Sequence, residues 1–117
     1  MRNALIFAAL AAAGATSAHA TGGFTCRTGG PRPVEVALGF GHVPGAPLIA
    51  RRLLDNGRDV PVEDAQWWLD RNEVRVLLIA PNGLREEVRV EARRRGSTFD
   101  GSLWRRGQRR WVRCREG

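Results

Sequence analysis

The sequence predicts an all-β protein, a small antiparallel meander that forms a barrel or sandwich of seven to eight strands. Short segments of alternating apolar and polar residues recur along the chain, and turn residues such as Asn-Gly and Pro-Asn-Gly separate them. No stretch beyond residue 20 has a strong helical periodicity. One cysteine lies near each end of this region, Cys26 and Cys114, so a disulfide is expected to tie the ends together.

Residues 1–20 have the pattern of a secretory signal peptide. Arg2 supplies a positive start, residues 4–13 form an apolar run, and residues 18–20 (AHA) fit the small-x-small site that signal peptidase cleaves. The apolar run is too short to span a membrane well. Residues 21–117 are therefore expected to form a single all-β domain in the periplasm or the medium, where the two cysteines would be oxidised.

The first two strands are predicted at residues 24–27 and 34–40, the second with Val, Leu and Phe at alternate positions. A loop rich in Gly and Pro follows and carries His42. This histidine could bind a metal ion or transfer protons, but no carboxylate, cysteine or second histidine lies near it in the sequence. We therefore favour an exposed or hydrogen-bonded role and expect no metal site.

The Asn-Gly pair at 56–57 predicts a hairpin that begins with residues 48–54. A two-residue turn there pairs Asp55 with Arg58, and Pro61 indicates that the second strand lies at an edge. Farther on, residues 65–69 read as another strand.

Trp67 and Trp68 must point to opposite faces if that strand is extended. One of them belongs to the core, and the other covers the outside or forms part of a contact surface. The pattern leaves open which is which.

The most hydrophobic strand is predicted at residues 74–80 and ends at the turn sequence APNG, residues 80–83. A type I turn with a bulge would set Ala80 opposite Leu84 and pair Val76 with Val88. The next strand would turn an alternating row of charges toward solvent, namely Arg85, Glu87, Arg89, Glu91 and Arg93. It ends in three consecutive arginines, residues 93–95, which could bind phosphate but are more often solvated in such a loop.

Residues 98–114 (TFDGSLWRRGQRRWVRC) predict a last hairpin, with a type II′ turn at residues 107–108. This register pairs Trp104 with Trp111. Because side chains alternate, one face carries Leu103, Val112 and Cys114 and is expected to be core; the other carries the two tryptophans and Arg113. The arginines gathered at the tip repel one another unless an anion or an acidic group lies there.

The charge of the chain favours an anionic partner. The sequence has 19 arginines, no lysine and 12 acidic residues, a net charge of +7, and about +6 remains without Arg2. Nucleic acid, anionic lipid headgroups, lipopolysaccharide and acidic proteins are the candidates, although such a charge also keeps a small domain soluble. No paired carboxylates, nucleophile elbow, metal-ligand cluster or phosphate loop is evident, so we expect neither catalysis nor a cofactor.

Several short motifs resemble those of the periplasmic and membrane-bound inhibitors of c-type lysozyme, which are small exported β-barrels. Residues 24–26 (FTC) lie where that family has an FxC strand, and residues 99–101 (FDG) and 103–107 (LWRRG) lie where it has a late YxxDGxxFWxKG-like motif. The resemblance implies a barrel in which a loop serine and a basic residue enter the lysozyme cleft. By position these would be Ser97 and Arg106.

Three hypotheses for the function follow. The first is an exported, non-catalytic protein that binds an anionic envelope or nucleic-acid component. The residues expected to contact this ligand are Trp104, Arg105, Arg106, Arg109, Arg110, Trp111 and Arg113. The second is an inhibitor that inserts the loop from Ser97 to Arg106 into a lysozyme-like enzyme. The third is a structural envelope protein without a ligand, in which the tryptophans are simple cross-strand packing.

Overall fold

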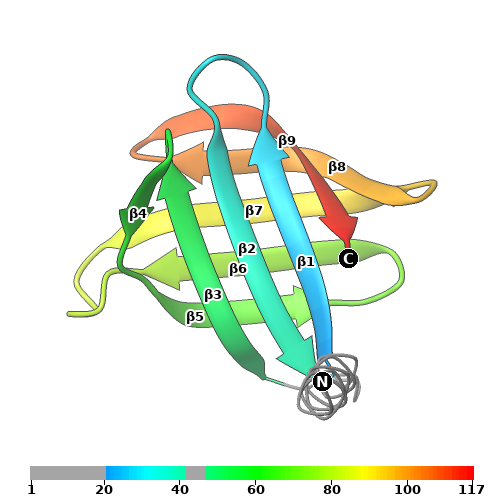
Figure 1. Cartoon of the computed structure of the whole chain (residues 1–117), viewed down its shortest axis with the longest axis horizontal. Helices are drawn as coiled ribbons and strands as arrows, with labels where there is room; N and C mark the ends of the chain where they lie inside the picture. Colours follow the sequence, from blue (N-terminus) through cyan, green and yellow to red (C-terminus); the bar gives the residue numbers. More distant parts are fainter. Residues whose placement is uncertain (1–20, 42–46) are drawn as a thin grey trace, which may run out of the picture.

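The computed structural model describes residues 21–41 and 47–117, which form one antiparallel sheet that curls into an open half-barrel (Figure 1). The strands are β1 (Thr21–Thr28), β2 (Val34–Gly41), β3 (Leu48–Asp55), β4 (Arg58–Val60), β5 (Glu63–Leu69), β6 (Glu73–Ile79), β7 (Glu86–Arg95), β8 (Thr98–Arg105) and β9 (Gln108–Glu116). Their order across the sheet is β4-β3-β2-β1-β9-β8-β7-β6-β5. The described residues contain no helix, and thus none that could cross a membrane.

The prediction of an all-β antiparallel fold is confirmed. The expected number of strands, seven to eight, was wrong, because the described residues form nine. The chain on either side of Pro61 forms two strands at opposite edges of the sheet, the three-residue β4 and the seven-residue β5. β4 pairs with β3, whereas β5 pairs with β6. The predicted signal peptide at residues 1–20 and the loop histidine His42 lie outside the described residues.

The two ends of the described domain meet in the middle of the sheet. β1 pairs with β9, and Cys26 lies directly opposite Cys114 in that pairing. The two residues form the predicted disulfide, and both are fully buried. The bond closes a loop with a sequence separation of 88 residues, which on the chain-entropy model stabilises the fold by about 4 to 5 kcal/mol.

The core lies on the concave face of the sheet, where the apolar residues of the alternating strands point. The rings of Phe24 and Phe99 meet edge to face at 5.3 Å between centroids. Trp67 is the inward member of the tryptophan pair: it packs against the core, and its ring centroid lies 5.4 Å from that of Phe40. Trp68 points outward and is 51% exposed.

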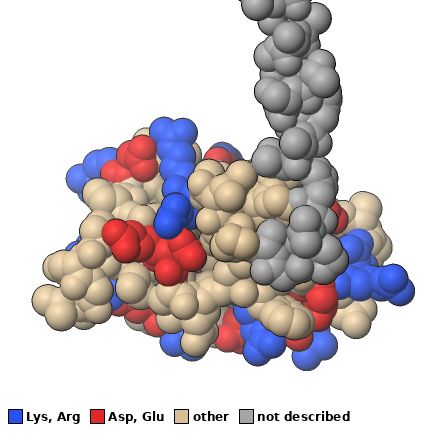
Figure 2. Space-filling model, turned by 90° about the horizontal axis from the view of Figure 1, so that it is seen from below, with Lys and Arg blue, Asp and Glu red and all other residues tan. Residues whose placement is uncertain are grey.

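The half-barrel has an open seam between its two edges. The edge strand β4 covers only residues 53–55 of β3, and the rest of β3 approaches the other edge, β5, without pairing with it. Arg51 on β3 crosses this seam, and its Nη2 lies 2.8 Å from Asp64 Oδ1 on β5. Figure 2 shows the molecule from the side of β5, where acidic and basic side chains both occur around an uncharged surface. Neither sign of charge dominates this side.

The hairpin at Asn56 and Gly57 forms as predicted. Both residues have positive φ, 53° and 84°, as a type I′ turn requires, and Asp55 pairs with Arg58. The strand that follows, β4, lies at the edge of the sheet, as Pro61 indicated.

The turn after β6 forms at the predicted residues, with a hydrogen bond from Gly83 N to the Ala80 carbonyl at 2.8 Å and a positive φ at Gly83, but the pairing beyond it differs from the prediction. Ala80 N donates to the carbonyl of Arg85, so Ala80 faces Arg85 rather than Leu84, across a loop that the Asn82 side chain stabilises by accepting from Leu84 N at 3.0 Å. This moves the pairing by one residue, and a bulge at Glu87 moves it by one more, so Val76 pairs with Val90 instead of Val88. The shift is two residues, so the valines still face the core.

A bulge in β7 moves Glu87 out of the predicted solvated row. Leu78 pairs with Val88 and Ile79 with Glu86, which leaves Glu87 as the extra residue. Its side chain turns inward and is buried, and its exposure was therefore wrongly predicted.

Candidate functional site

The last hairpin turns one residue earlier than predicted. The turn residues are Arg106 and Gly107, with φ of 53° and 79°, and not residues 107–108. Trp104 therefore faces Arg109, and Trp111 faces Ser102, so the predicted direct Trp104–Trp111 pair was wrong. The predicted register would have set Arg106 opposite Arg109 and Arg105 opposite Arg110. The observed register avoids these like-charge pairs and sets Asp100 opposite Arg113.

The faces of the hairpin are as predicted. Moving the turn by one residue displaces each pairing partner by two residues, which leaves every side chain of the hairpin on the same face. Leu103, Val112 and Cys114 are fully buried on the inner face. Trp104 and Trp111 lie on the outer face as diagonal neighbours; Trp111 is 55% exposed and Trp104 is partly buried.

Arg105 and Arg110 do not join the tryptophans, because alternation directs them to the other face. Arg105 is only 5% exposed and donates to the carboxylates of Asp55 and Glu87. Arg110 donates to the backbone carbonyls of Gly29 and Arg32 at 3.0 and 2.9 Å. Both guanidinium groups hold turns together at one end of the half-barrel.

Arg113 is on the tryptophan side, but Asp100 neutralises it. Its Nε and Nη2 lie 2.8 and 3.1 Å from the two oxygens of Asp100, and its guanidinium carbon lies 5.1 Å from the centroid of the Trp111 ring. The hydrogen bonds from Arg113 lower the pKa of Asp100, and they raise the pKa of Arg113. This pair positions the Trp111 indole and adds little net charge.

Arg106 and Arg109 keep their charge available. Arg106 is exposed at the tip, and Arg109 donates from Nε to Ser102 Oγ at 2.8 Å. Within the described part of the chain, neither forms an ion pair with a carboxylate. These two are the arginines of the predicted site that could bind an anion without breaking another ion pair.

Trp68 also belongs to this outer face, which sequence reasoning could not establish. Neighbouring strands align Trp68, Arg75, Glu91, Ser102 and Trp111 in one row across the sheet. The Trp68 indole donates to Asp70 at 2.9 Å, and the pKa of Asp70 is lowered by hydrogen bonds from Asn72 N, this indole and Glu73 N. We call the outer surface of β5 to β9, with Trp68, Trp104 and Trp111, the tryptophan face.

A hollow of about 340 Å³ lies in the tryptophan face beside Trp104. Its lining comes from β6, β7 and β8 and consists of Glu73, Arg75, Glu91, Ala92, Arg93, Arg95, Asp100, Gly101, Ser102 and Trp104. The guanidinium of Arg89 lies over the Trp104 ring, 5.9 Å from its centroid, and holds this aromatic wall in place. The hollow therefore combines an aromatic surface with hydrogen-bonding groups of both signs.

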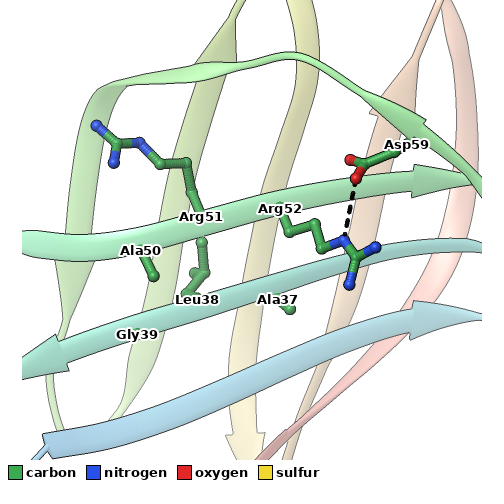
Figure 3. A pocket seen from close by; sticks show the side chains of 7 residues that line it. All are labelled: Ala37, Leu38, Gly39, Ala50, Arg51, Arg52 and Asp59. Atoms are coloured by element: carbon green, nitrogen blue, oxygen red, sulfur yellow. Dashed lines mark hydrogen bonds and ion pairs between the residues drawn. The ribbon is translucent and has the colours of Figure 1, made fainter.

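A second groove, of about 540 Å³, lies on the outside of β2 to β4 (Figure 3). Small side chains create it, because Ala37, Gly39 and Ala50 line it. Its charged groups include Arg52 and Asp59, which pair with each other at 3.3 Å. This groove thus offers few free polar groups to a ligand.

The residues of the inhibitor hypothesis do not share a loop. Ser97 precedes β8 and Arg106 follows it, so they lie in turns at opposite ends of a strand of eight residues. At a rise of about 3.3 Å per residue, the two positions are roughly 25 to 30 Å apart. The prediction of one loop from Ser97 to Arg106 was wrong.

Among residues 21–41 and 47–117, no group of three or more His, Cys, Asp or Glu side chains could hold a metal ion. No protein-family model matches the chain, and no curated protein or solved structure matches it.

Proposed function

We propose that the protein is an exported, non-catalytic binding protein that recognises an anionic polymer of the cell envelope through the outer face of the β8–β9 hairpin. The observation that carries this proposal is the combination at this hairpin of two outward tryptophans, Trp104 and Trp111, with the two unpaired arginines Arg106 and Arg109. Export is supported by the signal-like residues 1–20 and by the disulfide, which is typical of oxidising compartments.

The chemistry of these side chains fits such a ligand. Guanidinium groups bind phosphate, sulfate and carboxylate through several hydrogen bonds, and indole rings stack on flat or apolar parts of a polymer unit. The indoles are held by neighbouring groups: Arg113 lies over Trp111 and Arg89 over Trp104. A face whose aromatic groups are already positioned loses less conformational entropy when it binds.

Titration of the oxidised protein with dextran sulfate, lipopolysaccharide, inorganic polyphosphate and a single-stranded oligonucleotide tests the proposal, with tryptophan fluorescence as the signal. We expect Arg109→Gln and Trp111→Ala to weaken binding of at least one of them. Binding should also weaken steeply as salt increases, because each phosphate contact releases counterions.

The matched control is Arg58→Gln. Arg58 is exposed on β4, at the other part of the sheet, and forms no ion pair with any carboxylate in the described residues. Both arginine variants remove one charge, so equal losses would indicate attraction by net charge alone and would contradict the proposed location. If none of the four polymers binds, the exposed tryptophans have only a structural packing role and the proposal fails.

A further inference from the structure

The hollow beside Trp104 lies over a close approach of two strand backbones at Gly101. A Cβ built at Gly101 would lie 2.6 Å from Ala92 Cα on β7, closer than real Cβ atoms approach. The backbones of β7 and β8 therefore come unusually near each other, and the hollow lies over this contact, with Gly101 and Ala92 both in its lining. The backbone at this contact thus forms part of the hollow's lining, and side chains of β6, β7 and β8 form the rest.

The charges around the hollow balance, with three arginines against three carboxylates. Some of these groups are already engaged: Glu73 lies 3.6 Å from Arg75, and Asp100 binds Arg113. In the described residues Glu91, Arg93 and Arg95 have no ion-pair partner. The charge of Glu91 acts on Arg89 and that of Arg95 on Asp100, but no ion pair within the described part of the chain occupies these groups. The hollow therefore presents an acceptor and donors together, which suits a ligand that needs both and does not suit a chain of phosphates alone.

A sugar ring has this combination of properties. Its hydroxyl groups both donate and accept hydrogen bonds, so carboxylate and guanidinium groups can bind the same ring, while its C–H face packs on an indole. A volume of about 340 Å³ is at the small end of ligand sites, as a subsite for one or two rings of a longer chain would be. Trp104 supplies the aromatic wall.

The hollow is also joined to the anion-binding group of the proposed site. Ser102 lines the hollow, and its Oγ accepts a hydrogen bond from Arg109 Nε. Arg109 on β9 lies directly opposite Trp104 on β8. A charged substituent on a ring in the hollow would therefore lie beside Arg109.

We infer that this hollow is a subsite for a sugar ring of an anionic polysaccharide, with the ring packed on Trp104 and bound by Glu91 and Arg93. This inference rests on the proposed function and specifies it: the anionic polymer is a glycan, and its carboxylate or phosphate group is held by Arg109.

The test compares an oligogalacturonate hexamer with inorganic polyphosphate on the Glu91→Ala variant. Loss of this carboxylate removes a negative charge, so attraction by charge alone would make both probes bind more tightly. A sugar subsite predicts the opposite for the hexamer, about tenfold weaker binding through the lost hydrogen bonds, and no weakening for polyphosphate. The matched control is Glu63→Ala, an exposed carboxylate on edge strand β5 that has no ion-pair partner in the described residues.

Hexamer binding that is unchanged or tighter in Glu91→Ala would overturn the inference. It would also be overturned if polyphosphate or an oligonucleotide bound in an Arg109-dependent manner while the hexamer did not bind; the proposed function would survive that result. Absence of binding by every anionic probe would defeat both. Circular dichroism and urea unfolding of each variant separate loss of binding from loss of fold.

Discussion

Arg105 on β8 and Glu87 on β7 form a buried ion pair, with 2.8 Å between Nη1 and Oε1 and only 5% and 6% of the two side chains exposed. The same guanidinium donates from Nε to Asp55 on β3 at 2.9 Å. Since β3 and β8 are not neighbours in the sheet, these contacts connect the two halves of the sheet across one end of the half-barrel. The burial of charge is tolerated because each charged group has a partner.

Replacement of Arg105 by Leu should destabilise the protein by about 3 to 5 kcal/mol, because Glu87 would stay buried without its main partner. Urea unfolding would measure the loss. The double variant Arg105→Leu/Glu87→Leu should recover much of it, since apolar groups can replace a buried ion pair. Arg115→Leu is the control, because Arg115 is exposed on β9 without an ion pair in the described residues, and it should change stability by no more than about 0.5 kcal/mol. Equal losses in the Arg105 and Arg115 single variants would show that the buried pair has no special role.

Acid should destabilise the fold through carboxylates whose pKa values are lowered. Burial works to raise the pKa of Glu87, but the hydrogen bonds and charges of Arg105 and Arg85 outweigh it and leave the pKa lowered. Arg113 lowers the pKa of Asp100 in the same direction.

A lowered folded-state pKa means that the unfolded chain takes up protons first as the pH falls. The stabilisation from Glu87 and Asp100 is therefore complete near neutral pH, and it is lost as the pH drops below about 4, the usual range of carboxyl groups. Thermal unfolding between pH 7 and pH 2 would show this decline, and Asp100→Asn should make it shallower. A melting temperature that does not change down to pH 2 would contradict the assignment.

Gly101→Ala should be far more damaging than Gly22→Ala. At Gly101 a new methyl group would meet the backbone of Glu91 and Ala92, which cannot move without displacing β7. At Gly22 the nearest atom, at 2.7 Å, is Cε1 of the Phe40 side chain, which can shift. We expect a loss of about 3 kcal/mol or more at Gly101 and about 1 kcal/mol at Gly22, measured by urea unfolding. Similar losses at the two positions would show that β7 and β8 can separate easily.

The fold class could be derived from the sequence because its signals are local. Alternating apolar residues define the faces of each strand, Asn56 and Gly57 define their turn, and the pairing of Cys26 with Cys114 follows from their number and placement. The faces of the strands, apart from Glu87, were predicted correctly even where the register was wrong, because a register shift of two residues leaves a side chain on its own face. Both incorrect hairpin registers, at the turn after β6 and at the last turn, were shifts of this kind.

The composition of the candidate site depended on contacts between distant parts of the chain. The order of the strands brings Trp68 into the same row as Trp111, although four strand pairings separate them. Arg105 was expected to face a ligand, but Asp55, fifty residues away in sequence, binds it inside the half-barrel.

The sequence alone thus determined the all-β class, most of the turns, the disulfide and, apart from Glu87, which side chains share a face within each hairpin, because neighbouring residues and backbone geometry control these features. The tertiary structure decided which arginines remain free to bind an anion, where the bulge buries Glu87, and that a hollow opens beside Trp104. Those features arise from ion pairs and close backbone contacts between strands, and no local pattern encodes them.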